Sequence, residues 1–252
     1  MMKTDITVTA TIRPDILNTT LNSFVNNLFE HTTDLHLILN IDSVGDENYT
    51  VNDVINVAAR YFKDITVFAP ETPGFPAAVR RVWTAVRSDV FFHLEDDWLL
   101  LRKINFAEMQ QVMRTEPNLA LLRLPIFKIR EDHSKNWKWI FPRSENNTFF
   151  ECPEDIRQGM GFCGHPSLIN KKFLDEVLPM LSDRVDPERL LKGKNPKALP
   201  IVRKWRQGVF SEPNQPPAIR DIGREWRKEK GYTKRPIFQT WHKMREGDQW
   251  IG

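Results

Sequence analysis

Three consecutive carboxylates, Glu95-Asp96-Asp97, end an apolar run of the sequence and are followed by a tryptophan. Like charges side by side are costly in a folded chain unless positive charge offsets them. A strand that carries them to the rim of a sheet would form a divalent-metal site, because Mg²⁺ and Mn²⁺ prefer oxygen ligands. Side chains alternate along a strand, so we expect Glu95 and Asp97 to face the ion and Asp96 to face a sugar or ribose hydroxyl. The structural alternative is an exposed acidic turn that caps a helix.

Strand and helix patterns alternate through the first hundred residues, with short connections between them. This alternation is typical of βαβ units, in which helices cover the faces of a parallel sheet. It predicts an α/β fold with a mostly parallel sheet flanked by helices. The predicted strands cover residues 6–10, 35–41, 65–69 and 90–94, and the predicted helices cover 15–29, 51–62 and 76–87.

Polar residues follow several of these predicted strands. Thr11 and Arg13 come after the first strand, Asp42 after the second, and the acidic residues after the fourth. Ligands of parallel sheets bind outside the carboxyl ends of the strands. Together with the loop after residue 69, four separate segments therefore converge on one rim of the predicted sheet.

The second half of the chain is less regular. We expect a core of residues 1–182 and a basic, irregular C-terminal extension of residues 183–252 that completes the site and contacts the acceptor. A loop of about thirty residues inside a domain is usually functional or disordered. The predicted elements are helices at 104–115, 171–181 and 221–230, a strand at 119–126, a long loop at 128–158 and mixed strand and turn at 160–169.

Charge is distributed unevenly along the 252 residues. Residues 1–100 contain 7 Lys and Arg against 14 Asp and Glu, whereas residues 189–245 contain 16 Lys and Arg against 4 Asp and Glu. The net charge of the whole chain is only +3. This asymmetry indicates an anionic partner for the C-terminal part, either the phosphates of a nucleotide or a nucleic acid backbone. A solvated basic surface is the alternative.

Composition places the chain among globular proteins, with 40% hydrophobic and 27% charged residues. No apolar run is long enough for a membrane span, and the first residues lack the apolar segment of a signal peptide. Cys152 and Cys163 make no disulfide framework. With His165 they could be considered as zinc ligands, but a fourth ligand is missing, and small buried residues are the simpler interpretation. We therefore expect a cytoplasmic protein, in the host cytoplasm if the protein is viral.

The ordered motifs resemble a GT-A-fold (Rossmann-like) glycosyltransferase of the family-2-like type, which uses nucleotide-diphosphate sugars. The motif at 92–98, Phe-His-Leu-Glu-Asp-Asp-Trp, is similar to the family's Asp-x-Asp motif, with Glu in the first place. The resemblance covers residues 6–98 well and residues 164–169 more loosely, where the family tends to have a Gly-rich turn and a strand. The other matching motifs are Thr-Ala-Thr-Ile-Arg-Pro at 9–14, Asp42, and Gly-Phe-Pro-Ala-Ala-Val-Arg-Arg at 74–81.

The resemblance implies a role for each residue of the donor site. Asp42 would hydrogen-bond the nucleobase, with a UDP-linked sugar as the expected donor. Thr11 and Arg13 would line the nucleotide pocket. Arg80, or Arg81 as the second choice, would reach the pocket from the helix that follows Gly74.

The resemblance also implies a divalent metal, Mn²⁺ or Mg²⁺, held on the diphosphate by Glu95 and Asp97. Some GT-A enzymes add a C-terminal histidine to the metal shell, and His242 could supply it here. The structural alternative for a lone histidine is a packing role. A sugar diphosphate leaves only when its developing negative charge is neutralised, and a divalent ion with an arginine does that.

An inverting transferase also needs a base that deprotonates the acceptor hydroxyl. Glu188, and then Asp186, are our candidates, because family-2-like enzymes tend to place their base in this region. The pair Glu154-Asp155 is the competing cluster. Both candidates could instead be helix-capping residues after a turn at Pro187, and a retaining enzyme would need no such base.

Basic and aromatic residues are interleaved in the 130s loop and in the C-terminal part. These are the ingredients that bind a nucleic acid backbone and an unstacked base. They suggest a phage-type DNA glycosyltransferase that modifies 5-hydroxymethylated pyrimidines, with double-stranded DNA as the acceptor. The alternatives are a transferase acting on a surface glycan, and a nucleotide- or nucleic-acid-binding protein without transferase activity. The expected acceptor-binding residues are Trp137, Trp139, His165, Arg224 and Arg227.

Overall fold

The structure is a computed structural model that describes residues 3–126, 142–144, 146, 148–154, 164–191, 195–235 and 240–244. Within the last two ranges, it describes only the backbone of residues 234–235 and 240–242. Most of the long loop predicted at 128–158, including Trp137 and Trp139, lies outside these residues.

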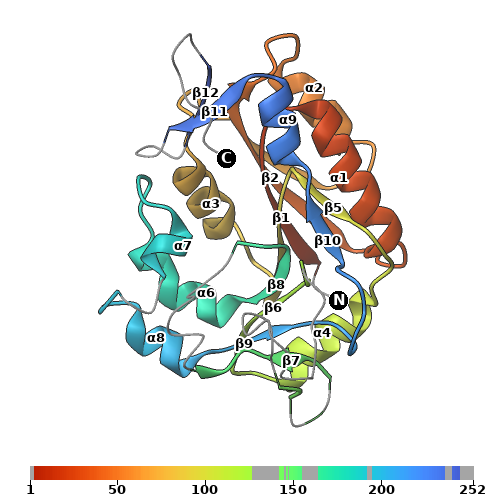
Figure 1. Cartoon of the computed structure of the whole chain (residues 1–252), viewed down its shortest axis with the longest axis vertical. Coiled ribbons are helices and arrows are strands. Elements are labelled where there is room, and N and C mark those ends of the chain that lie inside the picture. The colour runs from red at the N-terminus through yellow and green to blue at the C-terminus, as the bar shows by residue number, and fades with distance from the viewer. Residues whose placement is uncertain are drawn as a thin grey trace.

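An eight-stranded sheet forms the centre of the molecule (Figure 1). Its strand order is β3-β2-β1-β4-β8-β6-β9-β7. β8 runs antiparallel to its neighbours β4 and β6, and β7 runs antiparallel to β9, whereas the remaining neighbours pair in parallel. The carboxyl ends of β1, β2, β4 and β6 therefore meet at one rim. The strands are β1 (Thr4–Ile12), β2 (Leu35–Gly45), β3 (Ile65–Phe68), β4 (Val90–Glu95), β6 (Leu119–Arg123), β7 (Phe150–Glu151), β8 (Ser167–Asn170) and β9 (Arg206–Val209).

Two short two-stranded sheets accompany the main one. β5 (Trp98–Leu100) follows the acidic residues and pairs antiparallel with β10 (Ile219–Asp221), and β11 (Tyr232–Arg235) pairs with β12 (Thr240–Lys243). The first of these pairs brings the C-terminal part of the chain directly beside the acidic residues, with Asp221 opposite Trp98.

Helices cover both faces of the sheet (Figure 1). α1, α2 and α4 bury their apolar residues in one core with Ile6, Val8, Phe92 and Leu94 of the strands. α3 and α6 bury theirs in a second core with Phe91 and the neighbouring strands. The helices are α1 (Pro14–Asn27), α2 (Val51–Ala58), α3 (Phe75–Thr84), α4 (Phe106–Thr115), α6 (Lys171–Val177), α7 (Pro187–Leu190), α8 (Leu199–Lys204) and α9 (Gly223–Glu229).

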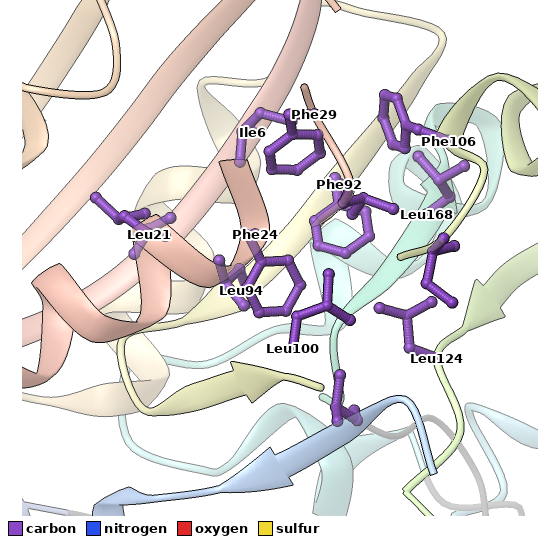
Figure 2. Packing of buried hydrophobic residues seen from close by; sticks show 14 of the residues in the cluster. Ile6, Leu21, Phe24, Phe29, Phe92, Leu94, Leu100, Phe106, Leu124 and Leu168 are labelled. Carbon is purple, nitrogen blue, oxygen red and sulfur yellow. The ribbon is translucent and has the colours of Figure 1, made fainter. Parts of the chain in front are cut away.

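Aromatic side chains hold the first core together (Figure 2). The ring of Phe29 meets Phe92 and Phe106 edge to face, with centroids 5.5 and 5.1 Å apart. Such pairs contribute roughly 0.5–1.5 kcal/mol each beyond the apolar area they bury. Because Phe92 lies only three residues before Glu95, this packing fixes the strand that delivers the acidic residues.

The second core contains a buried polar contact. The hydroxyl of Thr7 lies 2.9 Å from Nδ1 of His93, and the indole N–H of Trp83 donates to the same nitrogen at 3.2 Å. Burial lowers the pKa of His93 to about 3, so this histidine is neutral at physiological pH. His93 therefore serves the packing of α3 on β4 and takes no part in the chemistry of the rim.

The α/β pattern predicted for the first hundred residues is confirmed, with element boundaries that move by a few residues. The C-terminal extension, in contrast, is less irregular than predicted. It supplies a strand of the main sheet, β9, between β6 and β7. Only four residues long and containing Gly208, β9 carries too little periodicity to be recognised from the sequence. β7 likewise lies inside the predicted 128–158 loop.

Among the residues that the structure describes, no helix combines the length and the apolarity that a membrane crossing needs.

Candidate functional site

A cavity of about 380 Å³ opens at the carboxyl ends of β1, β2 and β4. It is the place where ligands of an open α/β sheet are expected. Its described lining carries more carboxylates than arginines, so the cavity favours a ligand that brings positive charge or a metal ion with it. The acids are Asp42, Glu95, Asp96, Asp97, Asp186, Glu188 and Asp221, and the arginines are Arg13, Arg224 and Arg227.

Asp42 lies at the β2 end of the cavity and is nearly buried. The backbone N–H of Gly74 and the side-chain amide of Asn40 donate to its two oxygens, each at 2.9 Å. Burial raises the pKa of Asp42, and these donors and the nearby Arg81 oppose the shift. The carboxylate is thus held in one orientation, as a group that recognises a ligand by hydrogen bonds needs to be.

The acidic residues form a turn rather than a continued strand. β4 ends at Glu95, and Asp96 and Asp97 occupy the turn that leads into β5. Arg13, which is 1% exposed, donates to both carboxylates of this turn, to Asp96 Oδ1 at 2.5 Å and to Asp97 Oδ2 at 3.1 Å. One guanidinium therefore offsets two of the three adjacent charges.

The alternation predicted for Glu95, Asp96 and Asp97 is wrong beyond Glu95, because it assumed a continuous strand. Asp96 accepts from Arg13 and from the backbone N–H of Thr11, and it is only 3% exposed. Burial raises the pKa of Asp96, and the adjacent Arg13 guanidinium opposes that shift. Its oxygens bind the protein itself, so Asp96 positions Arg13 rather than presenting a free group to a sugar.

Glu95 and Glu188 approach each other across Gly164. A Cβ placed on Gly164 would lie 3.4 Å from Glu95 Oε1 and 3.5 Å from Glu188 Oε1. The backbone N–H of Gly164 also donates to Glu188 at 2.6 Å, which orients that carboxylate. The structure thus brings the predicted metal ligand and the predicted base to the same wall of the cavity.

Asp186 has the structural role that the sequence left open for it. Its side chain accepts from the backbone N–H of Glu188 at 2.8 Å and caps α7. This bond favours Glu188 over Asp186 as the group available to a substrate. Of the competing pair, Glu154 is exposed and does not line the cavity, and Asp155 lies outside the described residues.

The C-terminal helix α9 packs directly against the acidic turn. The backbone N–H of Ile222 donates to the carbonyl of Asp97 at 2.9 Å. Gly223, the first residue of α9, lies so close that an added Cβ would contact Asp97 Cβ and Cγ at 2.6 Å. The indole of Trp226 lies over Arg13, 5.3 Å from the guanidinium carbon, and donates to Asp15 at 3.1 Å. The position of Asp97 therefore depends on a segment about 125 residues away in the chain.

We expect Gly223→Ala to displace Asp97 or α9, because Asp97 already occupies the space that the methyl group needs. Overpacking of this kind costs about 1–3 kcal/mol of folding free energy. The variant should also weaken Mn²⁺-dependent ligand binding, which thermal shift with and without Mn²⁺ would measure. Gly74→Ala is the matched control at the same rim, because its Cβ would meet only the Ala77 methyl at 4.0 Å. Equal behaviour of the two variants would show that the contact between Gly223 and Asp97 does not matter.

His165 lines the cavity beside Trp98, with ring centroids 5.2 Å apart. Burial, together with the charge of Arg123, lowers the pKa of His165 to about 4. The ring is therefore neutral at physiological pH and offers one donor and one acceptor nitrogen. Such a group suits a hydroxyl-bearing ligand better than an anion.

Three residues near the rim escaped the sequence interpretation. Asp221 lines the cavity through the pairing of β10 with β5, and Gly223 supports Asp97, but neither belongs to a recognisable motif. Arg123 ends β6 and is 2% exposed; its Nη2 donates to Gln207 at 2.7 Å, while its Nε and Nη1 have no hydrogen-bond partner among the residues that the structure describes. An arginine at the carboxyl end of a buried strand is the one signal that could have pointed to Arg123.

Several predicted site residues are not brought to the cavity. Arg80 is exposed and pairs with Asp183 at 3.1 Å, away from the cavity, because it lies on the outer face of α3. Arg81, the second choice, donates to the side-chain oxygen of Asn40, whose amide nitrogen in turn donates to Asp42. The side chain of His242 and the whole of Trp137 and Trp139 lie outside the described residues, so their roles remain predictions.

The residues present fit a divalent cation that is bound together with a phosphate ligand. Glu95 and Asp97 offer the hard oxygen ligands that Mg²⁺ and Mn²⁺ prefer. Within the described part of the chain, no three His, Cys, Asp or Glu side chains converge closely enough to hold an ion by themselves. An ion here would complete its coordination with water and phosphate oxygens, as Mg²⁺ usually does.

No family model matches the sequence, and comparison with curated proteins finds no match. Among solved structures, the chain is similar to Staphylococcus aureus TarS at 13% identity, with a TM-score of 0.54, over 84% of this chain and 35% of TarS. TarS 1–349 in complex with UDP matches at 12% identity and a TM-score of 0.55, over 84% of this chain and 58% of that one.

The mannosyltransferase PcManGT from Pyrobaculum calidifontis, in complex with GDP-Man and Mn²⁺, matches at 10% identity and a TM-score of 0.52. The match covers 85% of this chain and 56% of that one, so the chain spans between a third and three fifths of the length of these neighbours. These similarities show that the chain has the GT-A-type α/β fold that the sequence predicted.

Proposed function

We propose that this protein is a metal-dependent glycosyltransferase that moves a sugar from a nucleotide-diphosphate donor to a hydroxyl acceptor. One observation carries the proposal. Asp42, the acidic turn and Glu188, which are far apart in sequence, meet in one cavity at the carboxyl rim of a GT-A-type sheet. The neighbours of similar fold whose structures contain UDP, or GDP-Man with Mn²⁺, support the donor class.

The roles follow the geometry of the cavity. Asp42 recognises the base of the nucleotide, and Thr11 lies beside it at the end of β1. Glu95 and Asp97 hold the metal, which supplies positive charge to the leaving diphosphate. Arg13 and Asp96 keep the acidic turn in place, because their ion pair is buried beneath it. His242 would add a metal ligand only if its side chain reaches the cavity.

Glu188 is the proposed base. It lies on the wall of the cavity, and Gly164 separates it from Glu95. We assign Glu95 to the metal that binds the donor. A base must be within hydrogen-bond reach of the hydroxyl whose proton it takes. His165, a neutral neighbour on the same wall, can hydrogen-bond the acceptor.

A nucleotide-sugar screen tests the donor proposal. UDP- and GDP-linked sugars are added with Mn²⁺ or with EDTA, and the melting temperature and the release of free nucleotide are measured. We expect at least one donor to raise the melting temperature in a Mn²⁺-dependent way and to be hydrolysed slowly. A chain that binds nucleotides without hydrolysing any sugar donor would instead be a non-catalytic binding protein.

For the acceptor we propose 5-hydroxymethylated pyrimidines in double-stranded phage DNA. The support is the positive charge of residues 189–245, which exceeds what one diphosphate needs. Part of that charge is used inside the protein. Lys204 pairs with Glu176, Arg206 with Glu116 and Glu151, and Lys230 with Asp46. These pairs reduce the charge available to DNA and keep a surface glycan as the alternative acceptor.

Salt-dependent binding separates the two acceptors. Binding to duplex DNA should fall steeply as the salt concentration rises, because each phosphate contact releases a counterion. The product is then read by mass after incubation of the donor with hydroxymethylated and unmodified duplexes. If binding to duplex DNA does not change with the salt concentration, and the two duplexes give the same result in the product assay, a glycan acceptor is favoured.

A further inference from the structure

The three arginines that line the cavity differ in how much of their charge is available. Arg13 is buried and shared between Asp96 and Asp97. Arg227 is 4% exposed and interacts electrostatically with Asp97, although burial lowers its pKa. Arg224 is exposed, and among the described residues its guanidinium has no hydrogen-bond or ion-pair partner. Arg224 is therefore the cavity cation that a ligand can engage without breaking a bond of the protein.

The helix that carries Arg224, α9, lies beside α1 (Figure 1). Ile222 and Gly223 contact Asp97 of the acidic turn. The indole N–H of Trp226 donates to Asp15 at the start of α1. One turn further on, Lys230 pairs with Asp46 at 3.0 Å, just beyond the end of β2. α9 thus spans from Asp97 to the end of the strand that carries Asp42, the two residues that we assign to the metal and to the nucleobase.

The proposed base and its neighbours come from other segments of the chain than α9. Gly164, Glu188 and His165 come from the segments around β8 and α7, and α7 continues into Leu191, which packs in the second core with α6. α9 packs instead around Arg13 and α1. An arginine on α9 is consequently carried by the same packing that holds Asp97, which we assign to the metal on the donor's diphosphate.

We propose that Arg224 binds the diphosphate of the nucleotide-sugar donor, in place of the acceptor contact that the sequence suggested. The inference rests on the proposed transferase function. In that reaction the bond between the sugar's anomeric carbon and the β-phosphate oxygen breaks, and its electron pair stays on the diphosphate. The acceptor oxygen bonds the same carbon, and its proton passes to Glu188. A guanidinium can donate two parallel hydrogen bonds to phosphate oxygens, and it neutralises the charge that develops there.

The coupling of α9 to the acidic turn gives this arginine a second property. Because Gly223 rests on Asp97, the backbone that carries Arg224 is held next to the carboxylate that we assign to the metal. One diphosphate can thus meet the guanidinium of Arg224 and an ion held at Asp97 at the same time.

The test compares a nucleoside with its diphosphate, using the base that the donor screen identifies. Dissociation constants are measured by calorimetry for wild type, Arg224→Ala and Lys228→Ala, with Mn²⁺ and with EDTA. Lys228 is the matched control, since it is an exposed cation on the same helix that does not line the cavity. We expect Arg224→Ala to weaken diphosphate binding about tenfold or more in both conditions, with no change for the nucleoside. Lys228→Ala should match wild type.

The possible failures are distinguishable. If wild type binds no nucleoside diphosphate with Mn²⁺, the proposed function itself is wrong. If wild type binds it and Arg224→Ala binds equally well, only the role of Arg224 is overturned. If Arg224→Ala and Lys228→Ala lose the same amount of diphosphate affinity, the effect comes from the overall positive charge of α9 and the specific role of Arg224 is overturned. An unchanged diphosphate affinity with a raised KM for the acceptor would return Arg224 to the acceptor side.

Discussion

Asp97→Asn is expected to lower kcat/KM for the sugar donor about 10³-fold, because it removes a metal-binding charge at the centre of the cavity. A positive charge placed against the leaving diphosphate makes one of the largest single contributions to the rate of such a reaction. The substitution keeps the size of the side chain, so Gly223 and the backbone of Ile222 retain their neighbour. Arg13 keeps its closer partner, Asp96, at 2.5 Å. The fold should therefore survive the change.

The measurement is donor hydrolysis across a Mn²⁺ titration, with circular dichroism as the check on folding. We expect the variant to need far more Mn²⁺ than wild type, or to lose the Mn²⁺ response entirely. Asp64→Asn is the matched control, since Asp64 pairs with Lys3 on the surface at the opposite edge of the sheet. If Asp97→Asn keeps the wild-type Mn²⁺ response, Asp97 belongs to the structural support of Arg13 and holds no metal.

The half of the fold that forms the rim was predictable because its elements are local and periodic. The strand that delivers Glu95 is an apolar run, and its flanking helices have a 3.6-residue pattern. Each such element is decided by about ten neighbouring residues. The parallel alternation then leaves few topologies, so the shared rim followed directly.

The contacts made across the cavity were not predictable in the same way. Nothing in the sequence around Arg13 says that its guanidinium would be buried between Asp96 and Asp97 and covered by Trp226. Such contacts join segments up to about 210 residues apart, and they depend on tertiary packing. The alternation argument failed at Asp96 for the same reason, since it described a strand where the chain makes a turn.

The C-terminal part shows how a region without periodicity can still be decisive. β9 and β10 are four and three residues long, so they form only because β6 and β5 are present to pair with them. β10 pairs with β5, and this pairing places the start of α9 against the acidic turn. The excess of basic residues was visible in the sequence, but it could not separate the arginines that line the cavity from the lysines paired on the surface.

Glu188→Gln is expected to slow sugar transfer to the acceptor strongly while leaving donor binding unchanged. A positioned general base contributes about 10²–10⁴-fold, so transfer should fall by about 10³-fold. Gln keeps the oxygen that accepts from the backbone N–H of Gly164, and the wall of the cavity should keep its shape. The amide cannot take a proton, however, so the acceptor hydroxyl stays protonated.

Two measurements separate this prediction from simple loss of structure. Calorimetry with the nucleoside diphosphate and Mn²⁺ should give the wild-type dissociation constant, whereas product formation measured by mass falls. Glu154→Gln carries the competing hypothesis and should behave as wild type, because Glu154 does not line the cavity. If Glu188→Gln transfers sugar at the wild-type rate and the product keeps the donor's anomeric configuration, the enzyme is retaining and Glu188 only supports the Gly164 turn. If transfer falls and the configuration inverts, the wall that Glu188 shares with Glu95 is where the acceptor hydroxyl meets the donor.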